Sequence, residues 1–248
     1  MKEKKSLGQN FFVNKNLAEQ IVKKIVAVNH DVIVEIGAGE GYFTNIFNSY
    51  NENVIIIEKD DNLAKNLSLT YPNYTILNKD FLDWDFSELE NYSKKRILFF
   101  GSLPYNVSKK IIKKIIISKY FNTQSFFIIQ KEVAQKYTDR EPNNNLLSLQ
   151  TEIFTEAKKL FDISPTSFRP KPKVNSSLIT FKPLNRKIKN SKDFENFLIR
   201  CFKQPRKTLA NNLKGMKFEI SDKEKDLLDK RPQHLSFDQY LTLFQKRI

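Results

Sequence analysis

The chain has 248 residues, of which 40% are hydrophobic, and a formal net charge of +14. This length allows one large domain and a small one, and no apolar run approaches the ~20 residues that a membrane-spanning helix needs. One cysteine and two histidines exclude an intrachain disulfide and argue against a metal site, and the sequence after Met1 lacks a targeting pattern, so we expect a cytoplasmic protein without metal.

Short apolar runs alternate with helical patterns through the first half of the chain. Five strands are predicted there, at 31–35, 53–57, 74–77, 96–100 and 125–129. Helices are predicted from about residue 42, at 62–69 and at 106–119. Two closing strands are predicted at 156–163 and 176–181. Apolar strands that alternate with helices are typical of a parallel sheet covered on both faces, so we expect an α/β fold.

After Pro183 the pattern changes to helices with no strand between them. Helices are predicted at 192–202, 206–214, 222–230 and 236–245. The last one begins with Ser236-Phe-Asp-Gln239, which fits a capping box. We therefore expect two domains, an α/β domain over 1–183 and a small all-helical domain over 184–248.

A glycine-rich segment, Glu35-Ile-Gly37-Ala-Gly39-Glu-Gly41, follows the first predicted strand and opens the first helix. Its spacing differs from the G-x-G-x-x-G fingerprint of dinucleotide sites. Glycines allow positive φ and close approach of the backbone to a ligand. Because Glu40 lies within the turn, a phosphate would meet a negative charge, whereas the ammonium and sulfonium groups of S-adenosylmethionine would be attracted.

Two further acids follow the next two predicted strands. Glu58 can accept hydrogen bonds from both hydroxyls of a ribose, and Asp80 can accept one from an adenine amine while Phe81 packs against the ring. Each acid alone is more simply explained as a solvated strand end. Three acids after three successive strands meet at the carboxyl edge of the sheet, where α/β folds bind ligands, and this favours a site.

A stiff loop, Gly101-Ser102-Leu103-Pro104-Tyr105, follows the fourth predicted strand. Pro104 fixes its own φ and restricts the residue before it. Tyr105 offers a face for a flat ring, and carbonyls beside the proline can accept hydrogen bonds from an exocyclic amine. On its own, the same run also fits an ordinary turn at a strand end.

Basic residues are concentrated in the last third of the chain. The segments 163–192 and 199–218 contain no acid and many lysines and arginines. A genome whose composition favours lysine would raise the number of lysines but would not by itself separate basic from acidic residues along the chain. The distribution therefore favours a nucleic-acid partner.

Together with two further segments, these motifs resemble the ribosomal RNA adenine N6,N6-dimethyltransferase family over nearly the whole length. The segments are Lys4-Lys-Ser-Leu-Gly-Gln-Asn-Phe11 and Phe168-Arg-Pro-Lys-Pro-Lys-Val-Asn-Ser176. The resemblance implies a Rossmann-like S-adenosylmethionine-dependent methyltransferase sheet, followed by a small helical RNA-binding domain.

The resemblance also implies roles for individual residues. Contacts to S-adenosylmethionine are implied for Gln9, Asn10, Phe12, Gly37, Glu58 and Asp80, and we extend this candidate set to Glu35, Gly39, Gly41, Lys59, Phe81 and Ser102. The target adenine would be held by Ser102, Leu103, Pro104 and Tyr105, with Phe168 as an opposite wall. Candidate RNA-binding residues are Arg169, Lys171, Lys173, Lys203, Arg206 and Lys207.

Two branches of the family fit the chain. The KsgA branch dimethylates two adjacent adenosines near the 3′ end of small-subunit ribosomal RNA, and the Erm branch modifies one large-subunit adenosine and gives macrolide resistance. Gln130-Lys-Glu-Val-Ala134 and the 202–213 segment favour the KsgA branch, whereas the short length also fits Erm. We expect the immature small ribosomal subunit as the partner of a monomeric protein.

Ser102 departs from the family, which usually has asparagine at this position. In the family the amide oxygen and the carbonyl beside the proline accept hydrogen bonds from the adenine N6, which positions the amine without a strong base. A serine hydroxyl can accept such a bond but has a shorter reach. A binding or ribosome-assembly role without methylation, as in related mitochondrial transcription factors, therefore stays open, as does methylation of another exocyclic amine.

Overall fold

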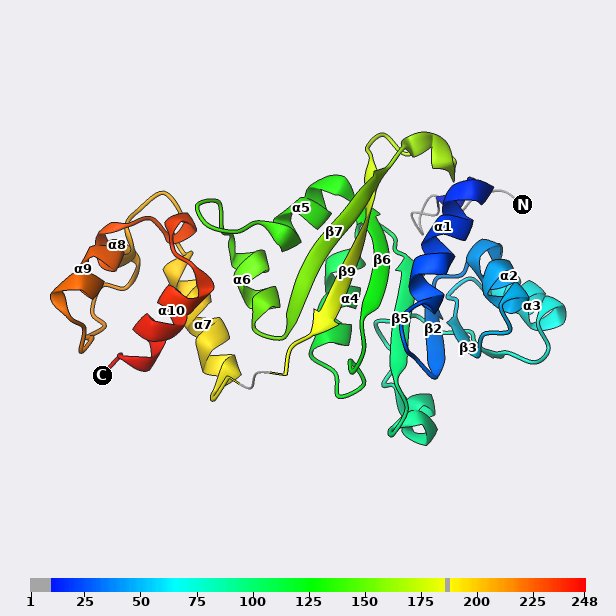
Figure 1. Cartoon of the computed structure of the whole chain (residues 1–248), viewed down its shortest axis with the longest axis horizontal. Helices are drawn as coiled ribbons and strands as arrows, with labels where there is room; N and C mark the ends of the chain where they lie inside the picture. Colours follow the sequence, from blue (N-terminus) through cyan, green and yellow to red (C-terminus); the bar gives the residue numbers. More distant parts are fainter. Residues whose placement is uncertain (1–9, 186–187) are drawn as a thin grey trace. The chain divides into compact units, whose positions relative to one another are not determined.

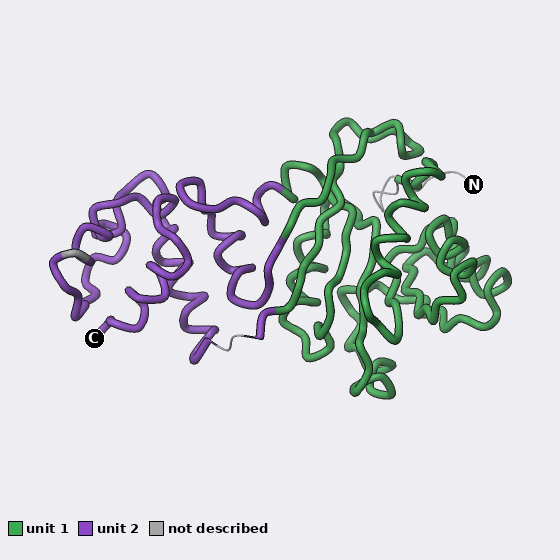
Figure 2. The backbone as a smooth tube through the Cα atoms, in the orientation of Figure 1, with its two compact units in different colours: residues 1–134, 158–183 green, residues 135–157, 184–248 purple. Residues whose placement is uncertain are grey.

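The computed structural model describes residues 10–185 and 188–248, which form two compact units (Figure 2). One unit comprises the residues up to Ala134 and Lys158–Pro183. The other comprises Gln135–Ala157 and Leu184–Ile248. The second unit thus contains 135–157 in addition to the 184–248 segment that the sequence analysis assigned to the smaller domain.

A seven-stranded sheet in the order β4-β3-β2-β5-β6-β9-β7 organises the fold (Figure 1). Its strands are β2 (Val32–Ile36), β3 (Val54–Ile57), β4 (Thr75–Leu77), β5 (Ile97–Ser102), β6 (Ser125–Gln130), β7 (Thr155–Ile163) and β9 (Ser176–Pro183). The pairs β2–β3, β2–β5, β3–β4 and β5–β6 are parallel, and β9 runs antiparallel to β6. The predicted α/β class is confirmed, because the apolar strands alternate with helices as expected.

Helices of the first part of the chain cover this sheet. They are α1 (Lys15–Val26), α2 (Tyr42–Ser49), α3 (Asp61–Thr70) and α4 (Ser108–Ile116), with short 3-10 turns η2 (Ser87–Tyr92) and η3 (Pro165–Ser167). Helix α5 (Lys131–Thr138) follows β6 and continues into the second unit. Phe100 of β5 packs against Phe43 and Phe47 of α2, at ring-centroid distances of 4.8 and 5.5 Å. Its neighbour Phe99 instead meets Phe86, as expected when successive strand residues point to opposite faces.

A short antiparallel pair, β1 (Phe11–Phe12) with β8 (Phe168–Arg169), lies outside the main sheet. Phe12 pairs with Phe168, and their rings meet edge to face at 5.1 Å. Asn14 caps α1 and also donates a hydrogen bond to the Ser167 hydroxyl at 3.2 Å. The start of the described chain is therefore tied to residues 167–169, which lie between β7 and β9.

The second unit is helical, apart from the first residues of β7. Its helices are α6 (Leu146–Glu152), α7 (Ser191–Cys201), α8 (Leu209–Asn212), α9 (Asp222–Asp229) and α10 (Phe237–Gln245), with the 3-10 turn η4 (Pro232–His234). Phe194 of α7 and Phe244 of α10 pack edge to face in its core. The predicted capping box at Ser236 is present, whereas the predicted helix at 206–214 forms only the four residues of α8. No helix among the described residues is long and apolar enough to cross a bilayer.

Candidate active site

A cavity lies at the carboxyl ends of β2, β3, β4 and β5, within the first unit. The predicted site residues that line it are Asn10, Phe12, Glu35, Gly37, Gly39, Glu58, Lys59, Asp80, Phe81, Ser102, Leu103, Pro104, Tyr105 and Phe168. Gly41 is the buried N-cap of α2 and is not one of the lining residues, and Gln9 lies outside the described residues. The cofactor loops and the target loop predicted from sequence thus share one cavity.

The glycine-rich turn between β2 and α2 has three residues with positive φ. Gly37, Gly39 and Gly41 have φ values of +68°, +59° and +78°, which L-amino acids with side chains rarely adopt. At Gly39 a Cβ atom would also stand 3.0 Å from the ring of Phe11. Glycine is therefore required at Gly39 both for the backbone conformation and for the approach of β1.

Glu58 connects this turn to the end of β3. Its side chain accepts hydrogen bonds from the N–H of Gly39 at 2.8 Å and the N–H of Asp60 at 2.9 Å, and the residue is only 6% exposed. Burial raises the pKa of Glu58, although the backbone hydrogen bonds oppose this shift. Each carboxylate oxygen keeps a second lone pair, so the group can still accept bonds from ligand hydroxyls.

Glu35 is the second buried acid of the cavity. It is 2% exposed and accepts a hydrogen bond from the Thr44 hydroxyl at 2.7 Å. Burial raises the pKa of Glu35 to about 8, and the nearby Glu58 carboxylate adds to the shift. Within the described ranges, no lysine or arginine forms an ion pair with Glu35 or Glu58. Two buried acids without a cation fit the positively charged groups of S-adenosylmethionine, because a cation beside them would favour the ionised form of both carboxyl groups.

Asp80 and Phe81 follow β4 and form another wall of the cavity. Asp80 accepts hydrogen bonds from the Lys59 ammonium at 2.7 Å and the N–H of Leu82 at 2.9 Å. Burial opposes ionisation of Asp80, but these two donors outweigh it and the pKa is lowered. Phe81 is 4% exposed and packs at 5.8 Å from Trp84. Asp80 is therefore an ionised acceptor beside an aromatic ring.

The 101–105 loop lines the cavity beside the glycine turn, because it follows β5, the neighbour of β2 in the sheet. A Cβ atom on Gly101 would lie 2.7 Å from the Ile36 carbonyl oxygen, so only glycine fits at this step. The N–H of Leu103 donates to the Ile128 carbonyl at 3.0 Å, and the Pro104 carbonyl accepts the N–H of Ser108 at the start of α4. The loop is therefore held to β6 on one side and to α4 on the other.

Tyr105 is oriented by a hydrogen bond that the sequence analysis did not predict. Its hydroxyl lies 2.7 Å from the hydroxyl of Ser176, a fully buried residue at the start of β9. Among the described residues, neither the Ser102 hydroxyl nor the Leu103 carbonyl oxygen has a hydrogen-bond partner. The loop thus presents two free acceptors next to an aromatic ring of fixed orientation.

The predicted RNA-binding side chains are exposed on both units. Arg169 is 64% exposed and lies 3.4 Å from the Glu40 carboxylate. Lys171 and Lys173 follow it in the first unit, and Lys203, Arg206 and Lys207 belong to the second unit, all exposed. Their positions are compatible with phosphate contacts.

Comparisons with known proteins identify the family of this chain. The family model described as ribosomal RNA adenine dimethylase matches residues 1–246. The chain belongs to this family. Members use S-adenosylmethionine as the methyl donor, so the ribosomal RNA adenine dimethylase assignment makes this protein a methyltransferase.

Relatives within the family match nearly the whole chain. The ribosomal RNA small subunit methyltransferase A of Malacoplasma penetrans is 36% identical, over 96% of this chain and 90% of the relative. The protein of the same name from Chlorobium phaeobacteroides is 33% identical, over 98% and 90%.

Two solved structures share the fold. The 23S rRNA methyltransferase ErmE and a dimethyladenosine transferase from Plasmodium falciparum each superpose with a TM-score of 0.78, at 20% and 21% identity. The matches cover 95% of this chain, with 98% of the ErmE chain and 96% of the Plasmodium chain.

Proposed function

We propose that this protein transfers methyl groups to N6 of two adjacent adenosines near the 3′ end of small-subunit ribosomal RNA. The observation that supports this best is the single cavity shared by the glycine turn, Glu58 and the Ser102–Tyr105 loop. The names of the full-length relatives favour the small subunit. A monomer in the cytoplasm that acts on the immature small subunit is part of the same proposal.

The cofactor side of the cavity binds and orients the donor. When bound, S-adenosylmethionine supplies an electrophilic methyl group on a positively charged sulfur. Glu58 would accept hydrogen bonds from ribose hydroxyls, and Asp80 with Phe81 would hold the adenine. Glu35 provides a carboxyl group that a nearby cation stabilises in its ionised form.

The target side of the cavity positions the amine that is methylated. The ring of Tyr105 stacks against an adenosine that has left its helix, because enzymes reach a base atom only after the base is unstacked. The Ser102 hydroxyl and the Leu103 carbonyl accept hydrogen bonds from N6, which directs its lone pair toward the methyl group. This arrangement depends on positioning rather than on a strong base.

Ser102 provides the sharpest test of catalysis. Immature small subunits are incubated with methyl-labelled cofactor and wild-type protein, Ser102→Ala or Ser102→Asn. We expect transfer by wild type and a loss on the order of 10²-fold in Ser102→Ala, since one acceptor is removed. No transfer by wild type together with recovery in Ser102→Asn would instead support a binding or ribosome-assembly role.

Mapping the methylated nucleotide tests the choice of RNA. Two adjacent methylated adenosines in small-subunit RNA are expected, and a single site in large-subunit RNA would favour the Erm alternative. Binding should also weaken steeply with salt, because contacts of exposed residues such as Lys171 and Arg206 with phosphates release counterions from the RNA. A flat salt response would contradict the RNA assignment.

A further inference from the structure

Lys114 differs from the other lysines of α4. Lys109, Lys110 and Lys113 are exposed, whereas Lys114 is half-buried and its side chain reaches the segment that follows Asp80. Its ammonium donates hydrogen bonds to the carbonyl oxygens of Phe81 at 3.1 Å and Leu82 at 2.6 Å, and to that of Trp84. Three donors thus meet three main-chain acceptors of one loop, which is the full donor capacity of an ammonium.

Aromatic rings complete the surroundings of this ammonium. The Lys114 nitrogen lies 5.7 Å from the ring centroid of Phe81 and 5.4 Å from that of Phe86, within the range of cation–π attraction. No acid among the described residues forms an ion pair with Lys114. The charge is therefore stabilised by the carbonyls and rings of the 81–86 segment and, without an ion pair, by the Asp80 carboxylate, whose pKa the Lys114 ammonium helps to lower. Loss of the ammonium would leave partly buried carbonyls without a donor.

The helix that carries Lys114 also belongs to the target side of the cavity. It begins three residues after Tyr105, and its residue Ile111 lines the cavity, as does Val107 just before the helix. The contact partners of Lys114 belong to the cofactor side, because Phe81 lines the same cavity. The Lys114 side chain thus connects α4, the helix that follows the target loop, to the loop on the cofactor side of the cavity.

We propose that Lys114 is a positioning residue whose ammonium fixes the Asp80–Trp84 loop against α4, and so holds Phe81 in place for the cofactor adenine. The inference rests on the proposed function of the cavity. It adds Lys114, which does not line the cavity but contacts residues that do. No strand pairing holds residues 80–84. Asp80 at one end of the loop accepts a hydrogen bond from Lys59, and Trp84 at the other end donates one to Glu88, whereas Lys114 supplies the hydrogen bonds that join the loop to α4.

The test uses Lys114→Met, which keeps the apolar stem and removes the three donors. Lys110→Met, on the same helix but exposed, is the matched control. Cofactor affinity is measured by calorimetry with S-adenosylmethionine, and the loop is followed by fluorescence, because Trp84 is the one tryptophan of the chain and is 1% exposed. We expect Lys114→Met to bind the cofactor about ten- to a hundred-fold more weakly, with red-shifted and more easily quenched emission. The control should match wild type in both.

Steady-state kinetics separate positioning from a general structural role. In Lys114→Met the KM for the cofactor should rise, while the KM for RNA and kcat at saturating cofactor stay within about threefold of wild type. If Lys114→Met fails to fold, Lys114→Gln, which retains two N–H donors, is compared with Lys110→Gln and should show an intermediate loss of cofactor affinity.

Unchanged cofactor affinity and unchanged Trp84 emission in Lys114→Met, or in Lys114→Gln where that is the variant compared, would overturn the proposal. So would an equal loss of RNA and cofactor affinity. Absence of cofactor binding by wild type would instead contradict the proposed function of the cavity, so the two failures are distinguishable.

Discussion

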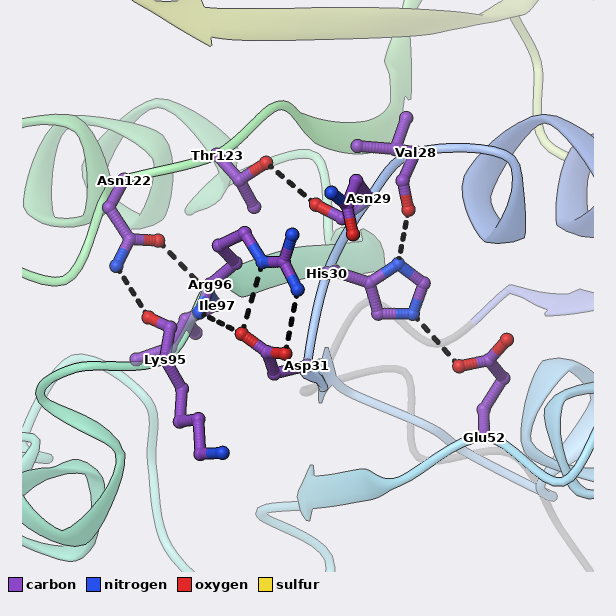
Figure 3. Close-up of polar contacts among 10 residues, drawn as sticks. All are labelled: Val28, Asn29, His30, Asp31, Glu52, Lys95, Arg96, Ile97, Asn122 and Thr123. Atoms are coloured by element: carbon purple, nitrogen blue, oxygen red, sulfur yellow. Dashed lines mark hydrogen bonds and ion pairs between the residues drawn. The ribbon is translucent and has the colours of Figure 1, made fainter.

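Two acids near the opposite ends of β2 have opposite surroundings. Asp31, just before the strand, accepts two hydrogen bonds from the Arg96 guanidinium, at 2.8 and 3.1 Å, and one from the Arg96 N–H (Figure 3). These contacts hold the pKa of Asp31 well below its usual range. Glu35, four positions later, is buried with one hydroxyl as its partner, and burial raises its pKa to about 8.

The difference separates an acid whose charge is matched by an arginine from a buried acid that has no cation beside it among the described residues. At the amino end, His30 also lies between two acceptors, the Val28 carbonyl at 2.6 Å and the Glu52 carboxylate at 2.8 Å (Figure 3). Polar groups there satisfy one another. At the carboxyl end, Glu35 and Glu58 are buried without a cation in the described part of the chain, an arrangement that costs folding free energy and is typical of functional sites.

The largest expected effect concerns the target loop at the carboxyl end. Tyr105→Ala removes the stacking surface, and because base stacking on an aromatic side chain contributes about 1–3 kcal/mol, methyl transfer should fall roughly 5- to 150-fold. Labelled transfer to immature small subunits measures this, with Arg96→Met from the amino end as the control. Equal activity of Tyr105→Ala and Arg96→Met would contradict the expectation that methyl transfer depends on the carboxyl end and not on the amino end.

A smaller effect, on cofactor affinity, is expected at Glu58. Glu58→Gln keeps the size of the side chain but replaces one acceptor oxygen by an NH₂ group, so an N–H of the glycine turn or a ligand hydroxyl loses its partner. Cofactor affinity should fall on the order of tenfold, as one hydrogen bond to a charged group is lost. Calorimetry measures the affinity, and a value equal to wild type would show that Glu58 does not contact the ligand.

Glu35 should make stability depend on pH in the ligand-free protein. Its folded-state pKa is about 8 and its ordinary value is 4.5, so between these pH values the folded protein holds a proton that the unfolded chain has released. The free energy of unfolding should therefore decrease as pH rises from about 4.5 to 8, by a few kcal/mol at most. Glu35→Gln should remove this decrease and be more stable than wild type at pH 8. Urea unfolding at pH 5.5 and pH 8 measures the free energy of unfolding at each pH. The same change in this free energy between the two pH values in wild type and in Glu35→Gln would contradict the assignment.

The smallest effect is expected at Asp31. Because Arg96 lowers its pKa, its contribution is present above the ordinary value and is lost as pH falls through the lowered pKa. The pair is partly exposed, so Asp31→Asn should change the urea midpoint only slightly at pH 7, and less in high salt. A large loss of stability would show that the ion pair at the amino end contributes more to the free energy of unfolding than its solvent exposure suggests.

Local pattern predicted the parts of the site that follow strands. Glu35, Glu58 and Asp80 each come after an apolar run, and parallel strands bring their carboxyl ends to one edge, so the cavity could be anticipated. The contacts of Ser176 with Tyr105 and of Lys114 with Phe81 were not predicted, since the two partners of each contact lie far apart in sequence. The two-residue pairing of β1 with β8 is too short to have a periodicity.

That pairing has a consequence for synthesis on the ribosome. Asn14 and Ser167 are 153 residues apart and hydrogen-bonded, and Phe11, next to Gly39, pairs with Arg169. Contacts between such distant segments form late, because the intervening chain must first be ordered. We expect that a nascent chain lacking β8 cannot close the wall over its glycine turn. Cofactor capture would then begin only after about two-thirds of the protein has been translated, and stalled chains of increasing length can test this.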